Sequence, residues 1–190
     1  RPNASQPVRT YAVGGSGATT LSVEIATQLC ARTGKDKSVC LIDLNFADGA
    51  AAAYLGSSAA MRLGELARAS DKLDASMLQA FVTPVTKQLD LLAAARDPMA
   101  FDTVPREAIL RMLEIACESY DWVILDMPRH RRSWSLDALG GRTWDAVVDL
   151  DPTQLPRHTR RRAELLAESA GHYVFVSTIS VYAANDKPAD

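Results

Sequence analysis

The sequence predicts a three-layer α/β/α fold built on a mostly parallel sheet. Apolar runs of strand length alternate with amphipathic stretches of helix length from residue 8 onward, and the runs within 38–44 and 120–129 each lead a row of aliphatic residues to an acid. Such runs are typical of parallel strands that are buried on both faces. Right-handed crossovers place the connecting helices on both sides of the sheet, so the alternation favours a three-layer domain.

Composition limits the classes of protein to which the chain can belong. The chain has 190 residues, of which 47% are hydrophobic, which is enough for a substantial core. Its 21 basic and 23 acidic residues give a formal charge of −2, which argues against wholesale nucleic-acid binding. Three widely spaced cysteines, Cys30, Cys40 and Cys117, indicate reduced thiols in a cytoplasmic protein. No stretch reads as a membrane span or a signal peptide.

A glycine-rich segment, residues 13–20 (Val-Gly-Gly-Ser-Gly-Ala-Thr-Thr), links a strand-like run at 8–13 to a helix pattern at 18–32. We call it the glycine loop. Its glycines permit positive φ and let backbone N–H groups approach an anion, and the helix start adds the positive end of its dipole. The segment therefore predicts a phosphate site, although a ligand-free turn is the alternative. The expected binding residues are Gly14, Gly15, Ser16, Gly17, Ala18, Thr19 and Thr20.

Acidic residues follow two of the predicted strands at the sheet edge where open α/β sheets bind ligands. We expect Asp43 to meet the glycine loop or its Mg²⁺, and Asp126 to hold a magnesium-bound water. Asp48, in the loop after Asp43, is expected to act through water near the terminal phosphate. The alternatives are that Asp126 caps the next turn and that Asp48 is an ordinary helix N-cap. Thr19 is placed where its hydroxyl could ligate Mg²⁺.

Weaker patterns complete the chain. Residues 1–7 read as a disordered lead-in, and Gly34 is expected to cap the first helix. Short helices are predicted at 50–55, 61–69 and 74–81, a strand at 89–94, and a helix whose first residue is Pro105. Arg96 is either a nucleotide contact or a solvated loop arginine. The tail predicts a strand at 143–150, a helix at 156–169 and a strand at 172–180.

The glycine loop resembles the deviant phosphate loop of the ParA/MinD family, Lys-Gly-Gly-x-Gly-Lys-Thr-Thr, with Val13 and Ala18 in place of the two lysines. Residues 41–44 with Asp48, 91–98 and 120–129 extend the likeness. Together, residues 8–138 resemble the ParA/MinD-like pilus-assembly proteins called TadZ or CpaE, whose domain is P-loop NTPase-like.

The resemblance implies a function. It implies that ATP and Mg²⁺ bind, that hydrolysis is weak or absent without the lysines, and that two chains can dimerise face to face. Backbone amides of the glycine loop would hold phosphates, Thr19 and Asp126 the metal, and Thr20 a phosphate, while Asp43 and Asp48 help to organise metal and water. The expected partners are assembly proteins of a type IV or Flp pilus secretion machine at a cell pole.

The tail gives a mixed signal. Residues 139–190 are expected to be the final β-α-β unit of the same sheet or a fused Rossmann-like fragment, because they also resemble part of an NAD-dependent epimerase. In that family the strand end supplies a hydroxyl to the substrate, here from Ser177, Thr178 or Ser180. The chain lacks that family's Gly-x-Gly-x-x-Gly and Tyr-x-x-x-Lys motifs. An epimerase or reductase is therefore the second hypothesis, and a scaffold without nucleotide is the third.

Two basic clusters, at 129–132 and 157–162, are the densest positive patches of the sequence. They could meet nucleic-acid phosphates or an acidic partner. Aromatic residues, which would stack on bases, are not interleaved with either cluster. Solvated faces are therefore the favoured interpretation, and a nucleic-acid partner is not expected.

Overall fold

The computed structural model describes residues 9–15, 17–70, 72–95, 104–128, 143–150, 160 and 163–176. The strands are β1 (Arg9–Gly15), β2 (Val39–Asp43), β3 (Thr83–Pro84), β4 (Leu89–Ala93), β5 (Trp122–Asp126), β6 (Trp144–Leu150) and β7 (Ala170–Phe175). The helices are α1 (Ala18–Arg32), α2 (Ala51–Tyr54), α3 (Leu63–Ala69), α4 (Ala75–Phe81) and α5 (Arg106–Ser119).

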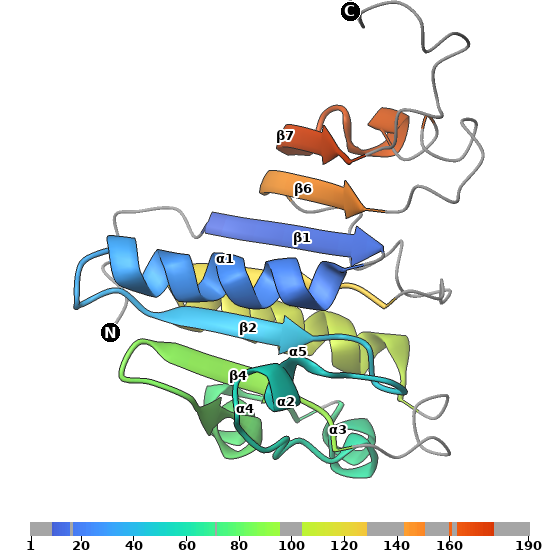
Figure 1. Cartoon of the computed structure of the whole chain (residues 1–190). Coiled ribbons are helices and arrows are strands. Elements are labelled where there is room, and N and C mark those ends of the chain that lie inside the picture. The colour runs from blue at the N-terminus through green and yellow to red at the C-terminus, as the bar shows by residue number, and fades with distance from the viewer. Residues whose placement is uncertain are drawn as a thin grey trace, which may run out of the picture.

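The strands form one sheet in the order β3-β4-β2-β5-β1-β6-β7. Every pairing is parallel except that of β3 with β4. Helix α1 crosses one face of the sheet and α5 lies behind it (Figure 1). The predicted fold class, a three-layer α/β/α domain with a mostly parallel sheet, is therefore confirmed.

Each face of the sheet has its own apolar core because successive strand residues point to opposite sides. On β2, Leu41 joins the cluster that contains Ala26 of α1, whereas Ile42 joins the larger cluster that contains Ile109 of α5. The short helices α3 and α4 pack with α5 on this second face. All five residues of β2 are buried. The continuous apolar run in the sequence thus reflects burial on both sides.

The two tail strands lie beside β1 in the same sheet (Figure 1). β6 pairs with β1 from Tyr11↔Ala146 to Gly15↔Leu150, and β7 pairs with β6 in parallel. A helical turn at 163–166 precedes β7 and buries Leu166 against the larger core cluster. Described parts of the tail therefore continue the sheet formed by the first part of the chain.

The structure differs from two local expectations and adds one strand that was not predicted. α1 ends in extended backbone at Thr33, and Gly34 is not among the described glycines with positive φ, so Gly34 does not cap the helix as predicted. Pro105 is the N-cap of α5 and not its first helical residue. The sequence analysis also missed β3, because a two-residue strand that contains Pro84 has no periodicity to detect.

A polar cluster joins the amino-terminal ends of β2 and β5. The carboxylate of Asp121 accepts hydrogen bonds from the backbone N–H and hydroxyl of Ser38, each at 3.0 Å, and from Lys37 Nζ at 3.0 Å. Burial tends to raise the pKa of Asp121, but these donors outweigh it and hold the pKa below its ordinary value. The cluster fixes the pairing of two central strands and therefore the alignment of their opposite ends.

Candidate functional site

The carboxyl ends of the central strands meet at one edge of the sheet. Val13, two residues before the end of β1, is aligned with Asp126 of β5, and Asp126 is aligned with Asp43 of β2. The glycine loop leaves β1 at this edge and enters α1 (Figure 1). The sequence-predicted residues of the loop and the two strand-end acids are thus neighbours in space, as expected from a parallel sheet.

Within the glycine loop, Gly17 has φ +84° and is the N-cap of α1. A Cβ added to Gly17 would meet no atom within 4 Å, so backbone conformation and not crowding requires glycine here. No described side chain caps the helix, and no acid occupies its first turn. The first N–H groups of this 15-residue helix thus have no side-chain cap among the described residues, an arrangement that suits phosphate binding at a helix start.

Thr19 links the beginning of α1 to the end of β5. Its hydroxyl donates to Oδ2 of Asp126 over 2.6 Å. The hydroxyl oxygen keeps its lone pairs while its proton is held by the carboxylate, so it can still ligate a cation. The pair that the sequence analysis proposed as the metal site is therefore in direct contact.

Asp126 is buried and only partly satisfied. Its relative exposure is 1%, and its Oδ1 has no hydrogen-bond partner among the described residues. Burial, together with the nearby charge of Asp43, raises its pKa to about 7, although the hydroxyls of Thr19 and Ser22 pull in the opposite direction. A buried carboxylate oxygen without a donor is costly, so this atom has free capacity for a cation or its water.

Asp43 is engaged mainly by the loop that follows it. Its Oδ1 accepts the N–H of Asn45 at 2.9 Å, and its Oδ2 accepts the N–H of Ala51 at 3.2 Å. Gly49 lies so close that an added Cβ would sit 2.7 Å from Oδ2 of Asp43. Burial raises the pKa of Asp43, while the backbone donors lower it. Asp43 therefore fixes the loop between β2 and α2, in addition to any contact that it makes with a ligand.

A hollow of about 360 Å³ borders Asp43 at the same edge of the sheet. It is lined by Asp43, Gly49, Ala52, Ala53, Ser57, Ala59, Ala93 and Ala94. Most of these side chains are methyl groups or absent, so the sheet edge near the ends of β2 and β4 offers open volume with a carboxylate on its wall.

Where the structure describes them, the other predicted residues of the glycine loop make no hydrogen bond of their own with the carboxylates of the two strand-end acids. Gly14 and Gly15 lie in β1, and among the loop's described glycines Gly17 alone uses the positive φ that glycine permits. Thr20 is exposed, and Ser16 lies outside the described residues. Ala18, at 4% exposure, stands in place of the second family lysine.

Asp48 is exposed in the loop between β2 and α2. The N-cap of α2 is Ala50, which has no side-chain cap, so the alternative that Asp48 caps this helix is wrong. Its proposed action through water stays a prediction. Arg96, the basic clusters apart from Arg160, and the three tail hydroxyl residues lie outside the described part of the chain. Arg160 pairs with Glu164 at 2.9 Å.

Ser22 is a site residue that the sequence analysis missed. It lies one turn after Thr19 on α1, is fully buried, and its hydroxyl has no hydrogen-bond partner among the described residues. Thr19, one turn earlier on the same helix, bonds to Asp126, and the Ser22 hydroxyl lowers the pKa of that carboxyl. The sequence held one signal for this residue: Ser22 is polar and lies three positions after Thr19, next to the apolar residues of the helix.

The donor set suits Mg²⁺ better than a transition metal. Mg²⁺ is held by few protein ligands, usually one or two carboxylates with hydroxyl groups, phosphates and water. Asp126 and Thr19 offer such oxygens. In the described part of the chain, no group of three or more histidine, cysteine or acidic residues is arranged to hold a metal by itself. The residues therefore fit an ion that arrives with phosphates.

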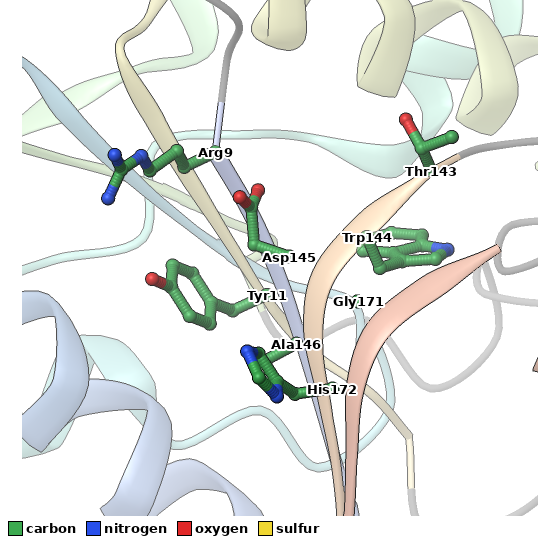
Figure 2. A pocket seen from close by; sticks show the side chains of 8 residues that line it. All are labelled: Arg9, Tyr11, Thr143, Trp144, Asp145, Ala146, Gly171 and His172. Atoms are coloured by element: carbon green, nitrogen blue, oxygen red, sulfur yellow. The ribbon is translucent and has the colours of Figure 1, made fainter.

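A second hollow, of about 450 Å³, lies where β1, β6 and β7 begin, at the opposite edge of the sheet (Figure 2). Arg9 lies over the ring of Trp122, 4.9 Å from its centre, and Tyr11 stacks on the same ring at 5.9 Å. Asp145 accepts the backbone N–H of Thr10 at 2.8 Å. Two charged residues that line this second hollow, Arg9 and Asp145, thus have partners within the protein. No sequence-predicted site residue lines the hollow. We therefore place the functional site at the glycine loop.

The raised pKa of Asp126 makes a prediction for stability. The folded protein retains the proton of Asp126 up to a pH of about 7, whereas the unfolded chain releases it near its ordinary value of 3.8. The protonated carboxyl of Asp126 therefore stabilises the folded state fully at pH values below 3.8, the pKa in the unfolded chain, and this contribution is lost as the pH rises through 7. Asp126→Asn, which stays neutral, should gain stability relative to the wild type between pH 4 and pH 8, by up to about 4 kcal/mol.

Denaturant unfolding at several pH values measures this difference. Asp48→Asn, which changes an exposed acid in a nearby loop, is the control and should run parallel to the wild type. A free energy difference between Asp126→Asn and wild type that stays constant with pH would contradict the assignment.

Comparison with known proteins rests on structure. No family model and no curated protein matches the sequence. Among the described residues, no helix has the length and apolar character needed to cross a bilayer.

Three solved ATPase structures are similar to this chain. The ParA family ATPase from Chlorobium tepidum TLS matches with a TM-score of 0.67 and 22% identity, over 90% of this chain and 73% of that chain. The Pyrococcus furiosus cell division ATPase MinD matches with a TM-score of 0.68 and 14% identity, over 95% and 76%. The septum site-determining protein MinD of Pyrococcus horikoshii OT3, complexed with Mg-ADP, matches with a TM-score of 0.66 and 12% identity, over 96% of this chain and 74% of that chain.

These identities are low, so the likeness shows the fold. None of the three structures is an epimerase or a reductase, and the comparisons give that alternative no support. The narrower prediction of a TadZ or CpaE protein stays a prediction. The chain has the fold of the ParA/MinD-type P-loop ATPases.

Proposed function

We propose that this chain binds ATP with Mg²⁺ at the glycine loop and hydrolyses it slowly or not at all. The observation that carries the proposal is the beginning of α1 at Gly17, which no described side chain caps and which lies directly beside the bonded pair of Thr19 and Asp126. The helix start supplies N–H donors for phosphate, and the Thr19–Asp126 pair supplies oxygens for a cation. The solved structure of MinD complexed with Mg-ADP shows that this fold accommodates that ligand.

Each residue then has a stated task. Backbone N–H groups of residues 14–20 bind phosphate oxygens, and the hydroxyl of Thr20 donates to a phosphate. Thr19 and Asp126 hold Mg²⁺, which neutralises phosphate charge when it is bound. Asp43 fixes the neighbouring loop and helps to organise the metal, and Asp48 orients water near the terminal phosphate.

The missing lysines argue for slow turnover. Val13 is fully buried in β1, and Ala18 has a methyl group where the family pattern has the lysine that contacts the terminal phosphates. Preorganised positive charge is a large part of catalysis in phosphoryl transfer, whereas backbone amides suffice to bind a ground-state phosphate. The site is therefore better suited to binding than to hydrolysis.

The biological role follows from the resemblance to TadZ and CpaE. We propose a cytoplasmic localisation or assembly factor for a type IV or Flp pilus secretion machine, acting at a cell pole and as a homodimer. Nucleotide binding would then serve to hold one conformation or assembly state. This role rests on the four sequence motifs together with the ATPase fold.

Binding of Mg-ATP is testable with a matched pair of glycine variants. Gly17 and Gly56 are both in the left-handed region, at φ +84° and +61°, and a Cβ at either would meet no atom within 4 Å. Alanine therefore brings a similar backbone strain at both positions, but only Gly17 belongs to the glycine loop. In calorimetric titration, Gly17→Ala should weaken Mg-ATP binding by about tenfold or more, equivalent to about 1.4 kcal/mol, while Gly56→Ala should retain it.

The outcomes separate the hypotheses. Equal affinities of the two folded variants would move the site away from the loop. NADH binding without ATP binding would favour the epimerase or reductase, and a folded chain that binds neither ligand would favour the scaffold.

Replacing the missing lysine tests the explanation for slow turnover. Ala18→Lys should raise the rate of ATP hydrolysis by at least about tenfold, because it returns a positive charge to the phosphate site. Ala18 is 4% exposed, so circular dichroism must first establish that the variant folds. An unchanged rate in a folded variant that still binds ATP would show that the missing lysine is not what limits hydrolysis.

A further inference from the structure

Ser22 is a buried hydroxyl that the arrangement of the core does not require. It is fully buried on the face of α1 that packs on the sheet, and Ala26, one turn further along the same face, is also fully buried. An alanine therefore satisfies the packing at the equivalent position. A buried hydroxyl without a partner lowers stability, so a serine here is unfavourable unless the hydroxyl has a use.

A second buried atom that lacks a partner in the described part of the chain, Oδ1 of Asp126, indicates what the Ser22 hydroxyl is for. Oδ1 of Asp126 is buried and accepts no hydrogen bond, and Ser22 Oγ is buried and makes none, among the described residues. Thr19 already donates to Oδ2 of the same carboxylate, and Thr19 and Ser22 lie three residues apart on one face of α1. The hydroxyl of Ser22 is close enough to favour the charged form of Asp126, although its geometry falls short of a hydrogen bond.

We propose that Ser22 is a positioning residue for the metal site, whose hydroxyl donates to Oδ1 of Asp126. Thr19 and Ser22 would then hold one carboxylate oxygen each and fix the rotation of the Asp126 side chain. A carboxylate has about four lone-pair positions, so two donors leave the others for Mg²⁺ or its water. The inference rests on the proposed function, because it concerns the same cation.

The test uses two substitutions of Ser22. Ser22→Ala removes the donor, and Ser22→Thr keeps it. Partners of metal ligands typically contribute 10–100-fold to metal affinity, so Ser22→Ala should weaken Mg²⁺ binding to the ATP-saturated chain by about tenfold. ATP binding without Mg²⁺ should be unchanged, and Ser22→Thr should restore Mg²⁺ binding. The carboxyl ¹³C chemical shift of Asp126, measured without ligand at pH 9, should change in Ser22→Ala and stay at its wild-type value in Ser22→Thr.

A control removes a buried hydroxyl elsewhere. Thr10, which is 8% exposed, donates to the carbonyl of Thr143 at 2.9 Å near the other end of β1. Thr10→Val should lower stability without changing Mg²⁺ affinity or the Asp126 signal. If Ser22→Ala behaves in the same way, Ser22 is a structural residue only and the inference is overturned.

Failure of the inference is distinguishable from failure of the proposed function. If the wild-type chain binds no ATP, the proposed function fails, but the ¹³C signal of the ligand-free chain still decides whether Ser22 contacts Asp126. If that signal changes while Mg²⁺ affinity does not, the contact exists and its role toward the metal is overturned.

Discussion

The parallel register of β1, β5 and β2 is the constraint on which the candidate site depends. It aligns Val13 with Asp126 and Asp126 with Asp43, so that the glycine loop and both acids share one edge of the sheet. At the opposite end, Asp121 ties β2 to β5 through Ser38 and fixes this alignment. The bond from Thr19 to Asp126 then joins the first helix to the central strand.

Burial of two neighbouring acids gives the site its chemical character. Asp43 and Asp126 are 2% and 1% exposed, and burial raises the pKa of both. Backbone N–H groups satisfy Asp43, whereas Asp126 keeps one oxygen without a partner. A cation at Asp126 would favour the charged form and release a proton, so metal binding and pH should be coupled. Val13 and Ala18 carry no charge, so a bound metal ion would supply the positive charge there under the proposed function.

Regular periodicity and strand-end acids made much of the fold predictable. The bounds predicted for α1, residues 18–32, are those of the structure, because its apolar face repeats at helical spacing. Two motifs led to the expectation that Thr19 and Asp126 serve one cation, and the structure adds a direct bond between them. The backbone engagement of Asp43 and the burial of Ser22 depend on how the α2 loop and α1 pack, which a linear pattern does not encode. The extended backbone of Gly14 and Gly15 likewise depends on their pairing with β6.

The most direct test of the central claim is a crystal structure of this chain grown with Mg²⁺ and a non-hydrolysable ATP analogue. We expect the phosphates to lie against the backbone amides at the beginning of α1, with the ion beside Thr19 and Asp126. A folded chain whose glycine loop is empty under saturating nucleotide, or whose nucleotide occupies the hollow near Tyr11, would contradict the assignment.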